Sequence, residues 1–163
     1  MQLFIKQKVF SWGDKFYVKN QYNEDVFCVQ GEVFSIGKKL HIYDMNENEL
    51  AFIKQKVLTF LPRYTIIQND IQVAEIVKKI SLLNQRYVVD GLGYTIDGDF
   101  LAHEYEVKDG GGNTVTTVSK KWMTWGDTYV IDTLDIVDPV IAVSLVIIID
   151  ACLATEAQVA ANS

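Results

Sequence analysis

The chain has 163 residues, of which 49% are hydrophobic, so it is long and apolar enough for one domain with a sizeable core. Its formal net charge of −6 argues against a general nucleic-acid-binding protein. The two cysteines, Cys28 and Cys152, fall in apolar runs, so we expect small buried side chains without a disulfide, as suits a reducing cytoplasm.

The chain opens directly on a strand pattern. Residues 1–6 lack the basic segment that begins a secretory signal peptide, so none is expected. Residues 5–18 read IKQKVFSWGDKFYV, with apolar and polar side chains alternating on both sides of Ser11-Trp12-Gly13-Asp14. Period-two alternation interrupted by turn residues predicts a strand, a turn and a second strand.

This fourteen-residue phrase occurs four times, as residues 5–18, 53–66, 76–89 and 118–131. Position one is always aliphatic, position twelve is aromatic and position fourteen is β-branched. Position four is always lysine, namely Lys8, Lys56, Lys79 and Lys121. Because an internal repeat is one structural unit, each copy predicts a β-hairpin.

The segments between the copies predict further strands, at residues 26–30, 40–43, 94–96 and 103–107. Each long spacer also turns at a polar cluster, once at residues 44–48 and once at residues 109–113. The sequence therefore predicts two half-repeats of about six strands each, residues 1–69 and 71–134, which a duplication would explain.

The last segment changes character at Asp138. This aspartate suits a helix N-cap and Pro139 suits the first helical position, so a helix is predicted over about 138–155 and a flexible tail over 156–163. The run from Val140 to Ile149 is apolar on every side, and such a helix is buried in protein or in lipid. Ten apolar residues before Asp150 are short for a membrane span of about 20, so burial in protein is favoured.

The predicted fold is mainly β, a closed antiparallel barrel of about twelve strands around a central hydrophobic C-terminal helix, in a single domain over residues 1–155. A barrel of twelve strands leaves a lumen that suits a helix about 10–12 Å across. The helix residues expected to fill it are Val140, Ile141, Val143, Leu145, Val146, Ile147, Ile148 and Ile149.

Basic charge is concentrated in the four copies, which hold most of the lysines and arginines and only two acids, Asp14 and Asp127. The favoured interpretation is that the lysines form the solvent side of the strands and discourage edge pairing. The alternative is that they form a surface for anionic lipid headgroups or another anionic partner. Position three is also polar although alternation turns it inward, which a bulge or a place at the rim would explain; its residues are Gln7, Gln55, Lys78 and Lys120.

Motifs for catalysis or metal binding are weak. His41 and His103 lie in strand patterns without metal-ligand spacing, and Gly110-Gly111-Gly112 is typical of a hairpin turn. Asp97-Gly98-Asp99 is interpreted as solvated acids in a tight turn. The sequence therefore predicts neither an enzyme nor a cofactor.

Two further groups of residues have a structural interpretation and a functional one. Asp132, Asp135 and Asp138 precede the helix at three-residue spacing, but a calcium site needs six to eight oxygens, so a metal site is not predicted. Packing at the barrel end is expected of Trp12, Trp122 and Trp125, with a membrane-interface or ligand-stacking role as the alternative.

Several phrases together resemble the LURP-one-related family. They are the IKQK-x-x-S-W-G-D-K-F opening, residues 37–44 (GKKLHIYD), 96–100 (IDGDF), 119–122 (SKKW) and 146–150 (VIIID). The resemblance implies a bacterial relative of the Tubby C-terminal domain and of the phospholipid scramblases, with a twelve-stranded barrel around a hydrophobic helix. Tubby-like domains bind phosphoinositides, but no motif here allows a lipid site or the scramblase calcium ligands to be carried over.

The sequence thus leaves three functions open. The first is a non-enzymatic module that binds an anionic membrane lipid or a protein partner, with Lys8, Lys56, Lys79 and Lys121 as candidate residues. The second is a structural or regulatory domain without lipid affinity. The third is a small-molecule carrier, which an open pocket of mixed polarity would favour. The predicted location is cytoplasmic, at most peripheral at the membrane, with no nucleic-acid partner and no transmembrane segment.

Overall fold

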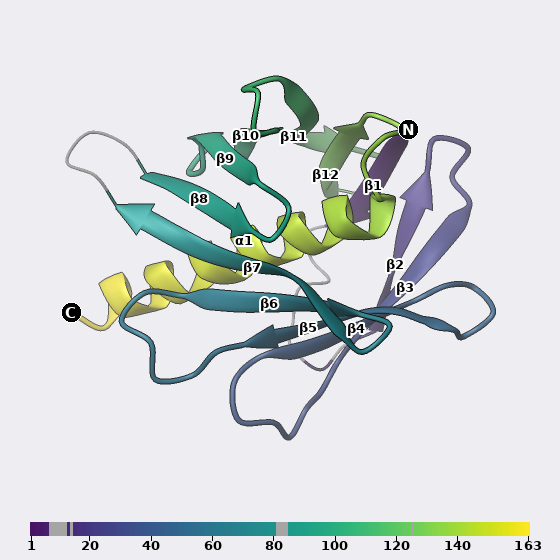
Figure 1. Ribbon diagram of the computed structural model, residues 1–163. Helices are drawn as coiled ribbons and strands as arrows, with labels where there is room; N and C mark the ends of the chain where they lie inside the picture. Colours follow the sequence, from purple (N-terminus) through teal and green to yellow (C-terminus); the bar gives the residue numbers. More distant parts are fainter. Residues whose placement is uncertain (7–12, 14, 81–84, 125) are drawn as a thin grey trace.

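The computed structural model describes all residues except 7–12, 14, 81–84 and 125, and it shows a closed twelve-stranded barrel around one helix (Figure 1). The strands of the first half are β1 (Gln2–Lys6), β2 (Lys15–Asn20), β3 (Asp25–Gly31), β4 (Lys39–Tyr43), β5 (Glu49–Gln55) and β6 (Arg63–Gln68). Those of the second half are β7 (Ile71–Ile80), β8 (Gln85–Asp90), β9 (Tyr94–Asp99), β10 (Glu104–Lys108), β11 (Thr114–Met123) and β12 (Gly126–Thr133). The predicted fold class is confirmed.

The barrel is a simple up-and-down arrangement. Each strand pairs antiparallel with the next along the chain, and β1 closes the barrel against β12 from Gln2↔Asp132 to Lys6↔Thr128. Closure satisfies the backbone groups that an open sheet would leave at its two edges. The backbone therefore needs no partner chain to complete the sheet.

The four copies of the repeated phrase form the β1–β2, β5–β6, β7–β8 and β11–β12 hairpins. Their first, twelfth and fourteenth positions face the lumen, since side chains on one face of a strand recur every second residue. All of these residues are buried; they are Ile5, Phe16, Val18, Ile53, Tyr64, Ile66, Ile76, Tyr87, Val89, Val118, Tyr129 and Ile131. Each of the four copies thus contributes three buried side chains to the core.

The helix α1 (Pro139–Ala161) begins where the sequence predicts and continues further. Asp138 is the N-cap, and its Oδ1 accepts a hydrogen bond from the Val140 amide at 2.8 Å. The segment 156–161 is helical, so the helix ends six residues later than the predicted residue 155. Their alanines, Glu156 and Gln158 are good helix formers, which explains the extension.

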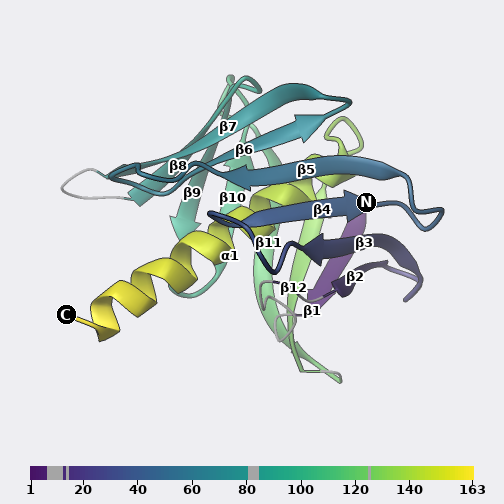
Figure 2. The same ribbon diagram turned by 90° about the horizontal axis from the view of Figure 1, so that it is seen from below.

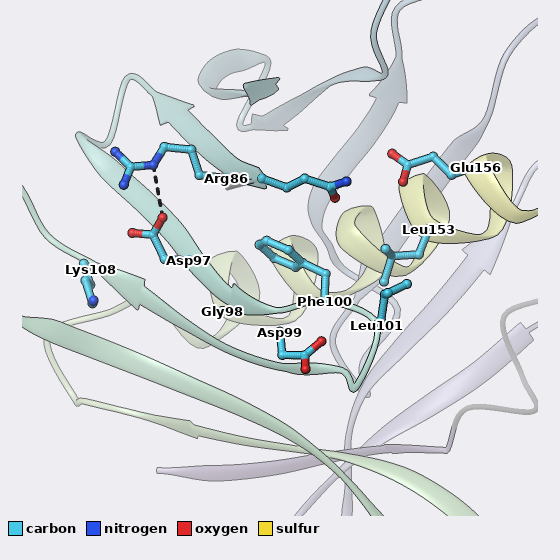
Figure 3. Close-up of a pocket in the computed structure, with 10 residues that line it drawn as sticks. Arg86, Asp97, Gly98, Asp99, Phe100, Leu101, Lys108, Leu153 and Glu156 are labelled. Atoms are coloured by element: carbon cyan, nitrogen blue, oxygen red, sulfur yellow. Dashed lines mark ion pairs between the residues drawn. The ribbon is translucent and has the colours of Figure 1, made fainter. Parts of the chain in front are cut away.

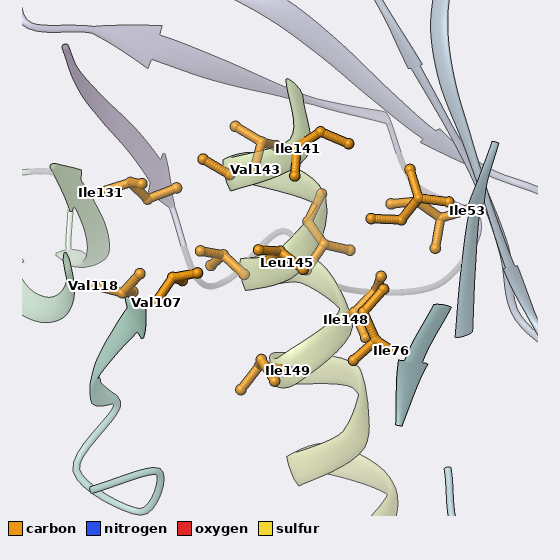
Figure 4. Close-up of a cluster of buried hydrophobic side chains, with 14 of the residues drawn as sticks. Ile53, Ile76, Val107, Val118, Ile131, Ile141, Val143, Leu145, Ile148 and Ile149 are labelled. Carbon is orange, nitrogen blue, oxygen red and sulfur yellow. The ribbon is translucent and has the colours of Figure 1, made fainter. Parts of the chain in front are cut away.

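Aliphatic side chains of α1 contact the inner faces of strands on several sides of the barrel (Figure 4). Ile141 and Val143 lie on opposite faces of the helix, and both are buried. By length and composition alone α1 could cross a membrane, but most of it is enclosed within the barrel (Figure 2). The interpretation as a core helix therefore holds.

The up-and-down topology gives the barrel two different ends. The connections that follow odd-numbered strands lie at one end, which we call the hairpin end because it includes all four repeated hairpins. The other connections lie at the opposite end, together with Met1 and the start of α1. The helix crosses the lumen, so its C-terminal turns emerge at the hairpin end beside the β5–β6 connection (Figure 1).

Candidate functional site at the hairpin end

The lysines at position four of the repeat lie at the hairpin end. Lys56, Lys79 and Lys121 are exposed, and each belongs to a different hairpin; Lys8 lies outside the described residues. Lys56 Nζ lies 2.8 Å from a carboxylate oxygen of Glu75, and Arg63 approaches the same oxygen at 3.5 Å. The structure therefore spreads these lysines around the rim instead of gathering them in one pocket.

The polar residues at position three lie at the rim of the lumen, which explains why they do not break the core. Lys78 is only 3% exposed and pairs with Glu156 of α1. Lys120 Nζ lies 3.0 Å from Asp127, and Gln55 Oε1 accepts a hydrogen bond from the Lys38 amide at 2.9 Å. Gln7 lies outside the described residues.

Polar contacts also fix α1 at the hairpin end. Lys38 Nζ donates to Thr155 Oγ1 at 3.1 Å and to the Ala151 carbonyl at 3.5 Å. Burial lowers the pKa of Lys38, since removing a charged group from water disfavours its charged form. Together with Lys78 and Glu156, Lys38 fixes the part of the helix that leaves the barrel.

A partly buried polar triad joins the β9–β10 connection, β12 and α1. The Tyr129 hydroxyl donates to Asp150, and it lies 2.8 Å from His103 Nδ1. Burial raises the pKa of Asp150 and lowers the pKa of His103. Sequence reasoning missed this triad and placed His103 in a strand, whereas His103 lies in the turn before β10 with φ of 55°.

The other groups that might act as nucleophiles or bases are already engaged. Both cysteines are buried and free of disulfides, and burial raises the pKa of Cys152 to about 12, so its thiol stays protonated at neutral pH. His41 lies on the outer wall, with its ring nitrogens 2.7 Å from Glu49 and 3.0 Å from Glu32.

Large apolar side chains are exposed on the connections of the hairpin end and at the end of β11. We call this set the apolar rim; it consists of Phe34, Ile36, Leu58, Phe60, Leu101 and Trp122. Trp122 is 81% exposed, so the expectation that it packs at the barrel end is wrong. The hairpins reach beyond the core, so the side chain of Trp122 is exposed there. Trp12 and Trp125 lie outside the described residues.

A cleft of about 710 Å³ opens in the barrel wall near the same end (Figure 3). It lies where β8 and β9 separate, because these strands pair only from Tyr87↔Ile96 to Val89↔Tyr94. Arg86 and Asp97 form an ion pair at 3.1 Å on one side, and Leu153 and Glu156 of α1 line the other.

Asp97, Gly98 and Asp99 also line the cleft. Their interpretation as a tight turn is wrong, because these residues form the end of β9. Glycine is required at residue 98, since a Cβ there would lie 2.5 Å from Tyr105 Cα. Asp97 and Asp99 therefore face the outer surface from a strand that packs unusually close to β10.

The opposite end has a different character. Asp44 and Asp109 occupy matching turns of the two halves, and each carboxylate accepts hydrogen bonds from amides two and four residues on. Before the helix, Asp138 caps α1, and Asp132 accepts a hydrogen bond from Gln2 at 2.9 Å. Among the described residues, no three His, Cys, Asp or Glu side chains are grouped so that they could hold a metal ion.

Comparison with known proteins places this barrel in a family. The model of the LURP-one-related family matches residues 1–150. The chain belongs to the LURP-one-related family. It is 36% identical over 150 residues to the "uncharacterized protein YxjI" of Bacillus subtilis, with 92% of each chain covered.

A solved structure shows the same fold in a plant protein. An Arabidopsis thaliana protein superposes with a TM-score of 0.65 at 14% sequence identity, covering 92% of this chain and 88% of that one. Because the identity is low, this similarity bears on the fold alone. The LURP-one-related chain is thus assigned by sequence and confirmed in architecture, while its ligand has to be inferred from its own surface.

Proposed function

We propose that this LURP-one-related domain is a non-enzymatic module that attaches to membranes containing anionic phospholipids through its hairpin end. The observation that supports the proposal is the difference in charge between the two ends. Basic residues outnumber acids at the hairpin end, which also carries Glu32, Asp99, Glu104 and Asp127, whereas acids outnumber Lys19 and Lys108 at the opposite end. Exposed Lys56, Lys79 and Lys121 lie at the hairpin end. The connections and strand ends of the opposite end carry Glu24, Asp25, Asp44, Glu47, Asp70, Asp90, Asp109, Asp135 and Asp138.

This difference orients the molecule at a negative surface. Each Lys or Arg close to an anionic membrane contributes about 1 kcal/mol, and the attraction decays within a Debye length of about 8 Å at physiological salt. Only residues at the facing end therefore contribute. The acids would be repelled if the opposite end faced the membrane, so the favoured orientation is the one in which the C-terminus of α1 points toward the membrane.

The chemistry of the described residues supports a binding role over a catalytic one. Cys152 is buried and protonated, and both histidines are engaged with neighbouring Tyr or Glu side chains. Membrane attachment requires none of these groups to react. The location that follows from the proposal is peripheral, on the cytoplasmic face of a membrane.

Co-sedimentation with vesicles tests the proposal. The wild-type chain should pellet with vesicles of phosphatidylcholine and phosphatidylserine, and less at high salt. Replacing Lys8, Lys56, Lys79 and Lys121 by Glu should leave it in the supernatant, whereas replacing Lys19 and Lys108 at the other end should not. Equal behaviour of the wild type and the four-lysine variant would count against lipid binding and favour a protein partner.

The wall cleft supports a second candidate function, the carriage of a small molecule. It is open, of mixed polarity and close to the size of common ligand pockets. Arg86, Asp97 and Glu156 supply charges, and Phe100 and Leu153 supply apolar walls (Figure 3). A fluorescent anilinonaphthalene sulfonate probe should bind saturably to the wild type and weakly to an Arg86→Gln, Leu101→Gln variant. If the probe binds both the wild type and the variant without saturation, the carrier function is excluded.

A further inference from the structure

The repeat places an apolar residue directly after each position-four lysine, and the structure exposes that residue. Val57 follows Lys56, Ile80 follows Lys79 and Trp122 follows Lys121. These three apolar side chains are 45%, 62% and 81% exposed. Alternation would turn them toward the lumen, but the hairpins extend past the core, so the inward side is uncovered there.

The loop tips between the hairpin strands are more exposed still. Phe34 lies in the β3–β4 connection, and Leu58 and Phe60 lie in the β5–β6 connection; all three are fully exposed. The two connections touch, because Gly37 packs against Val57 so closely that a Cβ would lie 2.7 Å from Val57 Cγ1. Leu58, Phe60, Ile80 and Val159 also line one groove of about 650 Å³ beside the end of α1.

The backbone of Leu58 is an independent sign that this tip has a role beyond folding. Its φ is 61°, in the left-handed region, where the Cβ of a bulky residue such as leucine comes too close to the backbone. The residue gains no compensating burial, because it is fully exposed. Strained residues that stability does not explain tend to occur at functional sites.

From these observations we infer that the apolar rim and the apolar residues after the lysines insert into the interfacial region of an anionic phospholipid bilayer, with the β5–β6 connection as the leading element. This inference rests on the proposed function and names the mode of attachment. Interfacial elements place apolar side chains about 5–10 Å into the headgroup and acyl boundary while adjacent lysines stay among the headgroups. On each of three hairpins a lysine is followed by an apolar residue, which suits lysines among the headgroups and apolar side chains below them.

A bilayer fits this surface better than a second protein does. The tips come from separate connections around a closed rim, so a broad deformable surface can contact them together. The opposite end also exposes apolar residues, among them Tyr22, Ile71 and Ile136. Those are less exposed than Phe34, Leu58 and Phe60, and they lie beside Glu24, Asp70 and Asp135, which an anionic surface repels.

The test combines a loss of binding with a measurement of depth. Leu58→Asn with Phe60→Ser removes two tips, and Asn tolerates the left-handed backbone, so the thermal midpoint should stay the same or rise. Partitioning onto vesicles of phosphatidylcholine and phosphatidylserine should fall about tenfold or more. An environment-sensitive fluorophore on Leu58→Cys should shift to the blue with vesicles, whereas one on Ile136→Cys should not; both native cysteines are buried.

The outcomes separate the inference from the proposed function. One outcome is that the wild type and the Leu58→Asn, Phe60→Ser variant bind vesicles equally and the fluorophore at residue 58 shows no blue shift. This outcome would overturn insertion and leave electrostatic attachment in place. A wild type that binds no vesicle would overturn both. Concentration-dependent dimers that the same variant abolishes, without vesicle binding, would overturn the inference and assign the rim to a second copy of the chain.

Discussion

The two ends of the barrel carry opposite surfaces on the same backbone. At the opposite end, Asp44 and Asp109 close short turns with their own hydrogen bonds, and acids dominate the connections. At the hairpin end, the long β3–β4 and β5–β6 connections carry Lys38, Lys56 and fully exposed apolar tips such as Phe34 and Phe60, while Lys79 and Lys121 lie at strand ends. The comparison teaches that one closed sheet can carry an acidic end with short turns and an end with lysines and exposed apolar side chains.

The helix repeats this contrast along its length. Its first turns, from Val140 to Ile149, are aliphatic apart from Ser144 and are buried in the lumen. From Asp150 onward, its side chains meet polar partners, as in the Tyr129–Asp150 hydrogen bond and the Lys78–Glu156 pair. The aliphatic half provides stability, and the polar half fixes where the helix leaves the barrel at the hairpin end.

Loss of the helix should have the largest effect, because it removes the structure that both ends share. Truncation after Asp135 deletes the apolar run 140–149, in which the burial of eight Val, Ile and Leu side chains contributes about 1.5–3 kcal/mol each before entropy. The sum is as large as or larger than the net stability of a domain, about 5–15 kcal/mol. The truncated chain should be insoluble or unfolded by circular dichroism. A soluble truncation with a cooperative melt would show that the helix is not the core.

The ion pair at the hairpin end should give an intermediate and asymmetric effect. Glu156→Gln leaves the nearly buried Lys78 without its carboxylate and should destabilise by about 2 kcal/mol in urea unfolding. Lys78→Met removes the buried charge instead and should cost less than half as much. Combining the two substitutions should recover most of the Glu156→Gln loss. Equal costs for the single variants would mean that Lys78 is solvated and the lumen mouth is open to water.

The polar triad should give the smallest effect, visible as pH dependence. Burial raises the pKa of Asp150 above its ordinary value of 3.8, so the stability associated with protonated Asp150 is lost as pH rises from about 4 to the raised pKa. Burial lowers the pKa of His103 below 6.5, so its contribution is lost as pH falls below that value. Asp150→Asn should therefore stabilise the domain at neutral pH, with the gain disappearing toward pH 4.

His103→Gln is the matched variant for the triad. It should remove the slope below pH 6.5 and leave the slope due to Asp150 in place. Thermal midpoints measured from pH 4 to pH 8 give both slopes. If Asp150→Asn destabilises equally at every pH in this range, its carboxylate acts through the Tyr129 hydrogen bond and not through its charge.

The fold could be predicted because its determinants are local and repeated. Period-two alternation around Ile53, Ile76 and Val118 specified hairpins, and the twelve-strand count fixed a lumen that the apolar run after Pro139 could fill. The helix end was missed because helix propensity in residues 156–161 was outweighed by their small size and polarity. Element type depends on neighbours in the chain, so one sequence was enough.

The site was only partly predictable, because it depends on which surfaces the topology brings together. The repeat identified the position-four lysines as candidates, which stay a prediction, and the polar position three pointed to a bulge or to the rim, where Lys78 lies. Trp122 was expected to pack, because sequence alone does not show where the core ends along a hairpin. The Tyr129–His103–Asp150 triad joins three distant segments, and the wall cleft follows from the short pairing of β8 with β9. Neither the triad nor the cleft produces a recognisable pattern among consecutive residues of the sequence.

The most direct test of the account is hydrogen exchange of the wild-type chain with and without phosphatidylserine vesicles, since it compares both ends in one molecule without substitutions. Protection should appear in the β3–β4, β5–β6 and β11–β12 connections and be absent from the β2–β3, β6–β7 and β12–α1 connections. Protection at the opposite end, or equal exchange at both ends when the protein is bound, would contradict the claim that the hairpin end faces the membrane.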